Sequence, residues 1–284
     1  MQGIINILKP AGMTSQKCVS LIKHKFNVKK VGHLGTLDPS GTGVLPICLG
    51  KATKLFDYYL DKDKVYRAIF VFSKETDTLD SDGKITKICK NIPSLEDINA
   101  VIPEFIGEFD QIPPKYSRKS INGKRAYELA RNDIEFEIKP KRITIYDFKC
   151  LKQISKNAFL FELHCSSGTY VRSVCRDLGQ RLNTCAYMGA IIRTRSGNFD
   201  ISKAETIDEC NENSIISIDN VLKDLEHINI NDSYYDKLVN GVRIVIESED
   251  KENVLVYCKG KLFGIAEIKQ KVLKIKTNLR GEND

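Results

Sequence analysis

Apolar and polar positions alternate along several segments of this 284-residue chain, which is the pattern of half-buried strands. The clearest cases are residues 64–72, 143–152 and 158–166, and the first of these is also rich in β-branched and aromatic side chains. Apolar runs at residues 3–8 and 44–49 have the length of strands. Capping residues and apolar positions at helical spacing predict helices over residues 15–26, 51–60 and 94–105, and another that begins near Thr169.

The pattern changes near residue 228. A short helix around residues 234–239 is followed by four predicted strands, at residues 242–247, 253–259, 262–269 and 272–277. Several short strands in so short a span predict a small β-barrel. We therefore expect two domains, at residues 1–228 and 229–284.

Three other segments give more local predictions. Residues 134–137 are expected to form a strand, and the acidic block at residues 203–228 is expected to contain two helices. Residues 76–83, Thr-Asp-Thr-Leu-Asp-Ser-Asp-Gly, are expected to form a polar turn that faces solvent.

Composition and charge narrow the class of protein. The net charge is +7, and residues 1–60 carry eight lysines against two acids, whereas residues 203–232 carry eight acids against two lysines. Separated basic blocks predict a face that binds a polyanion, although solvated lysine-rich surfaces would give the same pattern. No apolar run is long enough to span a bilayer and the first residues do not form a signal peptide, so we expect a cytoplasmic protein.

The nine cysteines contain no CxxC pair, which argues against a metal site and predicts free buried thiols.

One stretch stands out for its chemistry: residues 31–50, VGHLGTLDPSGTGVLPICLG. It places a single acid, Asp38, directly before Pro39, so the carboxylate lies on a stiff, glycine-lined loop that leads into an apolar strand. A fixed lone acid is a candidate catalytic group. An ordinary structural turn explains the same residues, and a phosphate-binding loop is weakly indicated because no Gly-Lys-Ser/Thr follows.

Residues 33–46 of this stretch, with the glycine before them, resemble the aspartate motif of the bacterial synthases that form pseudouridine at position 55 of tRNA. The opening GIINILKPAGMTS and the later GTYVR also resemble segments of that family. The resemblance implies an α+β fold: a mixed, mostly antiparallel sheet with flanking helices, followed by a small PUA-like β domain that binds RNA.

The same resemblance implies roles for individual residues. Asp38 would be the catalytic nucleophile or general base, Arg172 would form an ion pair with it, and Tyr66 would stack on the base or transfer its proton. Contacts with RNA are implied for a further set: His33, Ile191, Lys119, Lys124, Arg125 and Tyr170. His33 would fill the space that a flipped base leaves. In the strand at residues 187–199 an isoleucine, Ile191, stands where the family has leucine, and Ile192 replaces an arginine.

The implied activity is isomerisation of uridine to pseudouridine in the T loop of tRNA, with base flipping and with neither a cofactor nor a metal. The implied partner is the T stem-loop of tRNA, bound by a monomer without a membrane. Two alternatives stay open on the sequence: a pseudouridine synthase that acts on another RNA, and a non-catalytic protein that binds or folds tRNA.

Overall fold

The computed structural model describes residues 1–60, 62–117, 119–121, 123–132 and 134–280, and its largest element is a nine-stranded sheet. Seven strands lie side by side in the order β1 (Gly3–Lys9), β3 (Thr42–Leu49), β12 (Ala186–Ser196), β4 (Lys64–Phe72), β11 (Ala158–Cys165), β10 (Lys141–Ser155) and β7 (Gly107–Gln111). Two short strands extend it, since β2 (Val31–His33) pairs with β3 and β13 (Phe199–Asp200) pairs with β12. All these pairings are antiparallel except that of β12 with β3. The predicted mixed, mostly antiparallel sheet is therefore confirmed.

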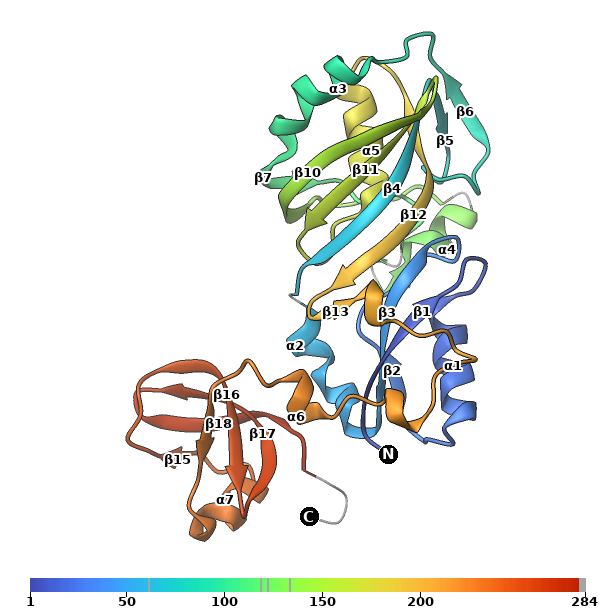
Figure 1. Cartoon of the computed structure of the whole chain (residues 1–284). Helices are drawn as coiled ribbons and strands as arrows, with labels where there is room; N and C mark the ends of the chain where they lie inside the picture. Colours follow the sequence, from blue (N-terminus) through green and yellow to red (C-terminus); the bar gives the residue numbers. More distant parts are fainter. Residues whose placement is uncertain (61, 118, 122, 133, 281–284) are drawn as a thin grey trace.

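Helices cover one face of this sheet, where the largest apolar cluster forms (Figure 1). Helix α5 (Val171–Arg181) contributes Val174 to this cluster, and α3 (Leu95–Val101), continued by the 3-10 turn η2 (Ile102–Phe105), contributes Ile98. They pack with aromatic side chains of the strands, among them Phe70 and Phe161, whose rings stack 4.5 Å apart. Helix α5 is thus packed firmly against the sheet, and its first turn carries Arg172.

Helix α1 (Ser15–Lys25) packs beside β1 and β3 and begins where the sequence predicts. Thr14 caps it by accepting a hydrogen bond from the backbone NH of Lys17 at 3.1 Å. Its apolar side, which includes Cys18 and Ile22, lies in a second buried cluster with side chains of β1 and β3. After β3 the chain enters the 3-10 turn η1 (Gly50–Leu55) and α2 (Phe56–Leu60), which together match the helix expected at residues 51–60.

The parallel pairing of β3 with β12 joins two parts of the sheet across a narrow contact. Ile192 lies opposite Thr42, and Arg193 lies opposite Gly43. Gly43 has a φ of +106°, and a Cβ atom built on it would lie 2.2 Å from the carbonyl oxygen of Arg193. Only glycine fits there, because both the backbone conformation and the space exclude a side chain.

Residues beyond 226 form a second, curled five-stranded sheet with the order β14 (His227–Asn229), β16 (Lys251–Cys258), β17 (Lys261–Lys269), β18 (Val272–Asn278) and β15 (Ile244–Val245). Helix α7 (Tyr235–Val239) follows the turn η5 (Asp232–Tyr234) and lies beside this sheet (Figure 1). Leu238 of α7 belongs to the sheet's own apolar core. The sheet also contacts the first part of the chain, since the ammonium of Lys54 donates to the carbonyl of Asn278 at 2.8 Å. The division into two domains at residue 228 stays a prediction.

The remaining elements are short. They are the hairpin β5 (Lys74–Thr76) with β6 (Ile85–Ile88), the hairpin β8 (Ser120–Ile121) with β9 (Lys124–Arg125), α4 (Ala126–Arg131), η3 (Ile201–Lys203), η4 (Glu212–Ser214) and α6 (Ile218–Val221). No helix in the described ranges is both long and apolar enough to cross a membrane.

Three local predictions are wrong. Residues 134–137 form no strand, and the block at residues 203–228 contains one four-residue helix, α6, with 3-10 turns in place of two helices. Cys89 and Cys185 are joined in a disulfide, contrary to the expectation of free thiols. Two backbone hydrogen bonds through Ser73 hold these cysteines side by side, from the NH of Cys89 to Ser73 and from the NH of Ser73 to Cys185.

Candidate active site

Asp38 lies on the loop between β2 and β3, and two buried side chains hold that loop in place. The hydroxyl of Ser15 donates to the carbonyl of Leu37 at 3.0 Å and accepts from the NH of the same residue at 2.9 Å. The ammonium of Lys9, which is fully buried, donates to the carbonyls of Gly41 at 2.7 Å and Pro39 at 3.1 Å. Burial lowers the pKa of Lys9, whereas the nearby charge of Asp38 raises it. The predicted stiffness of the loop thus comes from β1 and α1 as well as from Pro39.

The guanidinium of Arg172 lies beside the Asp38 carboxylate, as the sequence predicts. One terminal nitrogen is 2.9 Å from Asp38, and the other is 3.2 Å from the carboxylate of Asp80. The same nitrogens donate to the carbonyls of Tyr116 at 3.1 Å and Thr78 at 2.9 Å. The Arg172 side chain is 7% exposed, whereas that of Asp38 is 42% exposed. A buried cation therefore orients an acid that a substrate can reach.

Asp80 is a part of this site that the sequence did not reveal. The prediction that residues 76–83 face solvent is wrong at this position, because the Asp80 side chain is buried against Arg172. Burial raises the pKa of Asp80, while the hydrogen bond from the Thr78 hydroxyl and the charge of Arg172 lower it. The polar turn sequence gives no sign that Asp80 is buried, because its partner, Arg172, lies far away in the sequence on α5.

Tyr66 and Arg193 lie opposite each other on the paired strands β4 and β12. Burial raises the pKa of the Tyr66 hydroxyl, and the adjacent Arg193 guanidinium opposes that shift by charge and by a hydrogen bond. Arg193 is itself buried and donates to the carbonyls of Val44 at 2.8 Å and Gly35 at 3.1 Å. The sequence interpretation missed Arg193. The available signal was a cation at an inward-facing position of the strand that carries Ile191.

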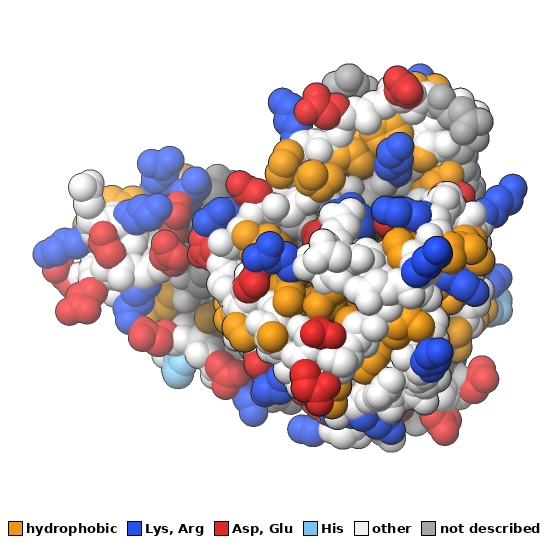
Figure 2. All heavy atoms as spheres, turned by 90° about the horizontal axis from the view of Figure 1, so that it is seen from above, with side chains coloured by type: hydrophobic (Ala, Val, Ile, Leu, Met, Phe, Trp, Pro, Cys, Tyr) orange, Lys and Arg blue, Asp and Glu red, His pale blue; other side chains and the backbone are white. Residues whose placement is uncertain are grey.

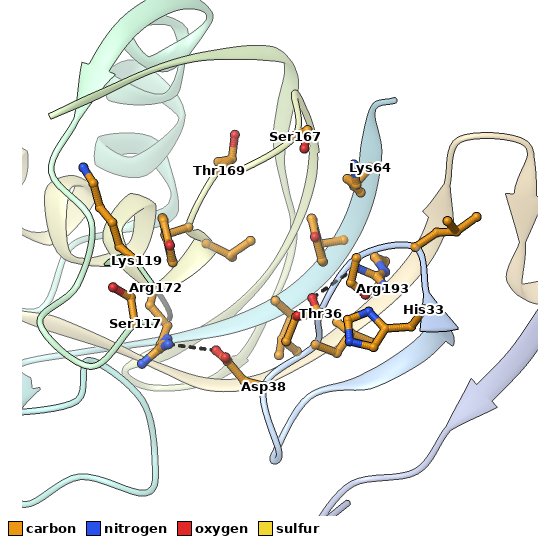
Figure 3. Close-up of a pocket in the computed structure, with 18 of the residues that line it drawn as sticks. His33, Thr36, Asp38, Lys64, Ser117, Lys119, Ser167, Thr169, Arg172 and Arg193 are labelled. Carbon is orange, nitrogen blue, oxygen red and sulfur yellow. Dashed lines mark hydrogen bonds and ion pairs between the residues drawn. The ribbon is translucent and has the colours of Figure 1, made fainter. Parts of the chain in front are cut away.

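These side chains surround one cavity of about 380 Å³ (Figure 3). Seven of the nine residues expected in the site line it: Asp38, Arg172, Tyr66, His33, Ile191, Lys119 and Tyr170. Lys124 is exposed on β9 and is not among the described residues that line the cavity. The side chain of Arg125 lies outside the described part of the chain. The structure thus brings the proposed catalytic trio of Asp38, Arg172 and Tyr66 together around one cavity.

The charge of the cavity favours an anionic ligand. Among the described lining residues Asp38 is the only carboxylate, while Lys64, Lys119, Arg172 and Arg193 are cations. Figure 2 shows Lys and Arg side chains spread over the face of the molecule seen from above, with Asp and Glu side chains among them. A cavity with one reachable acid and several cations is suited to a phosphate-bearing substrate on which that acid acts.

Comparison with known proteins gives a consistent result. The model of the TruB family pseudouridylate synthase, N-terminal domain, matches residues 23–171. The tRNA pseudouridine synthase B of Alkaliphilus oremlandii is 39% identical over 292 residues, covering 97% of both chains. The protein of the same name from Clostridium perfringens strain 13 is 42% identical over 250 residues, covering 86% of this chain and 85% of the relative.

Solved structures support the fold. The chain resembles one from the crystal structure of the archaeal box H/ACA sRNP Nop10-Cbf5 complex, with a TM-score of 0.71 and 23% identity over 99% of this chain and 87% of that one. A chain of an H/ACA RNP bound to a substrate RNA containing 2′-deoxyuridine gives a TM-score of 0.72, again at 23% identity, over 99% of this chain and 86% of that one. At this identity the likeness concerns the fold alone. The family match and the close relatives show that this chain belongs to the TruB family of pseudouridylate synthases.

Proposed function

We propose that this chain isomerises uridine to pseudouridine in tRNA, and that its target is uridine 55 of the T loop. The observation that carries the proposal is the Asp38 carboxylate, held 2.9 Å from a buried arginine and open to a cavity rich in cations. In the reaction the N1–C1′ bond breaks, the uracil turns, and a C5–C1′ bond forms. N1 gains a proton and C5 loses one, so atoms and electrons balance without an external oxidant or reductant.

Asp38 would act on the ribose in its ionised form. Arg172 fixes the direction of the carboxylate through a charge-assisted hydrogen bond. Two routes fit this geometry: attack of the carboxylate on C1′, or removal of the proton at C2′. A substrate with deuterium at C2′ distinguishes them, because only the second route breaks that bond and shows a primary isotope effect.

Tyr66 would contact the uracil and take part in removing the C5 proton. Burial raises the pKa of its hydroxyl, and the adjacent Arg193 guanidinium opposes that shift by stabilising the phenolate, which is the form that can accept the C5 proton. Ile191 lines the same cavity and would pack against the base. For the uridine to enter, the base must leave its stack at a cost of a few kcal/mol. We propose that His33 occupies the vacated space.

The RNA would be held mainly through its phosphates. Lys119 and Tyr170 line the cavity, and we assign Lys124 and Arg125 on the neighbouring hairpin to contacts with the T stem. Such contacts position the RNA and weaken steeply as salt rises. We further propose that the protein acts as a monomer in the cytoplasm and that the curled C-terminal sheet adds to RNA binding.

The variant Asp38→Asn tests the proposal. It should abolish tritium release from a T stem-loop labelled at C5 of uridine, while RNA affinity stays near that of the wild type. Asp236→Asn, which changes an exposed acid of α7, should retain full activity and serves as the control. Retained turnover in Asp38→Asn would remove the aspartate from the reaction. Undiminished product from tRNA with another base at position 55 would show that the target lies elsewhere.

A further inference from the structure

The cavity extends to both sides of Asp38 (Figure 3). In Figure 3, Asp38 lies between Ser117, Lys119 and Arg172 on one side and His33, Arg193 and Lys64 on the other. The uridine contacts proposed above involve Asp38 with its partner Arg172, and Tyr66 and Ile191, which line the same cavity. A second wall of the cavity is formed by His33 of β2 and by Phe56 and Tyr59 of α2.

Phe56, the first residue of α2, belongs to this second wall. Its side chain lines the cavity and is 41% exposed. By contrast, Leu55, directly before it, is 0% exposed, and Tyr59, three residues later, is 3% exposed. The turn η1 directly before Phe56 packs against β2, since a Cβ atom on Gly32 would lie 3.6 Å from the Thr53 methyl group. Strand β2 ends at His33, and His33 and Phe56 both line the cavity.

An exposed ring at this place has a chemical use. A large apolar side chain at the rim of a cationic cavity gains nothing from phosphates, but its face suits an unstacked base. The cations supply attraction that is independent of sequence, and the ring supplies a contact that only a base can make. The other exposed large hydrophobic side chains in the described part of the chain, such as Ile88, do not line this cavity.

We propose that Phe56 is a stacking platform for a base adjacent to the target uridine, so that the cavity holds two nucleotides of the substrate RNA. This inference rests on the proposed function, because it takes the RNA and the flipped uridine from it. Phe56 is a positioning residue in this scheme: it orients the neighbouring nucleotide, and the backbone of that nucleotide then places the uridine against Asp38.

Three substitutions at Phe56 separate stacking from simple apolar packing. Phe56→Ala should weaken binding of a T stem-loop about 10-fold, since stacking of one base on an aromatic ring contributes roughly 1–3 kcal/mol and 1.4 kcal/mol is a factor of ten. Phe56→Leu keeps an apolar side chain without a π-face and should lose nearly as much. Phe56→Trp should bind as tightly as the wild type. Ile88→Ala, at a side chain that is 72% exposed on β6, is the control and should change nothing.

A double cycle with abasic RNA identifies the stacked base. Two stem-loops are made, each lacking the base on one side of the target uridine. With one of them, Phe56→Ala and the wild type should bind equally, because the stacking partner is already gone. A loss of equal size with both abasic RNAs and with the intact RNA would overturn the proposal, as would wild-type affinity in Phe56→Leu.

Failure of this inference can be told from failure of the proposed function. If the wild type releases no tritium from the intact stem-loop, the proposed function is wrong. If the wild type releases it normally and the Phe56 variants bind like the wild type, only the stacking proposal is wrong. Thermal melting of each variant shows that it is folded, and the Leu and Trp variants give the answer even where the alanine variant unfolds.

Discussion

Replacing Arg172 with lysine tests the central geometry of the site while keeping its charge. The guanidinium uses two nitrogens to hold two carboxylates, Asp38 at 2.9 Å and Asp80 at 3.2 Å. A lysine has one nitrogen and cannot reproduce this planar fork. At least one carboxylate therefore loses its partner. Since a hydrogen bond to a charged group contributes about 1.5–3 kcal/mol, we take about 2 kcal/mol as the loss.

If that loss falls on the orientation of Asp38 in the transition state, turnover should slow by about 30-fold. RNA affinity should change little, because the Arg172 side chain is only 7% exposed and its guanidinium pairs with Asp38. A single-turnover assay of tritium release, with the affinity measured separately, separates the two quantities. The matched control is Arg176→Lys, one turn further along α5, where Arg176 pairs with Asp177.

Two results would refute this reasoning. Turnover of Arg172→Lys within a few-fold of the wild type would show that the charge alone suffices and that the fork is not needed. An equal decrease in Arg176→Lys would show that any change on α5 disturbs the site.

Three further predictions follow from the buried groups. Arg193→Met should lower the free energy of unfolding by about 3 kcal/mol, measured in urea, because the carbonyls of Val44 and Gly35 lose a charged donor; an unchanged midpoint would contradict this. Burial raises the pKa of Asp80 in the folded protein. The free energy of unfolding of the wild type should therefore fall relative to that of Asp80→Asn as the pH rises from 3.8 through the folded pKa. A difference in free energy of unfolding that stays constant with pH would contradict the burial argument. Reduction of the disulfide, or Cys185→Ser, should lower the free energy of unfolding by about 2–4 kcal/mol, whereas Cys150→Ser, at a free cysteine, should respond to reductant as the wild type does.

Sequence periodicity predicted the main elements well because their apolar faces are buried against one another. Alternation along β4 and β11 reflects a sheet with one covered face, and the helical spacing in α1 reflects contact with β1 and β3. Predictions failed where burial depends on a distant partner or is slight. The acidic block at residues 203–228, for which the sequence predicts two helices, lies against β1 mostly in turns.

The candidate site was predictable only in part, for a related reason. Asp38, Tyr66 and Arg172 lie within segments whose resemblance to a family is strong. Asp80 carries no such local signal, and the signal for Arg193 is limited to its inward-facing position on the strand that carries Ile191. Their environment is created by the fold: a polar turn becomes buried when Arg172 reaches it, and a strand arginine becomes a structural cation when three carbonyls gather around it. The disulfide between Cys89 and Cys185 also has no local sequence signal, because the two cysteines become neighbours only through their backbone hydrogen bonds with Ser73.

The glycine contact between β3 and β12 has a consequence for how the site is assembled. Asp38 belongs to the part of the molecule that carries β3, and Tyr66 belongs to the part that carries β12 and β4. Any side chain at position 43 would act as a wedge between them, moving the acid away from the tyrosine without touching either. Catalytic competence should therefore report on the closure of this joint, and the chain should acquire it only after its two halves have docked.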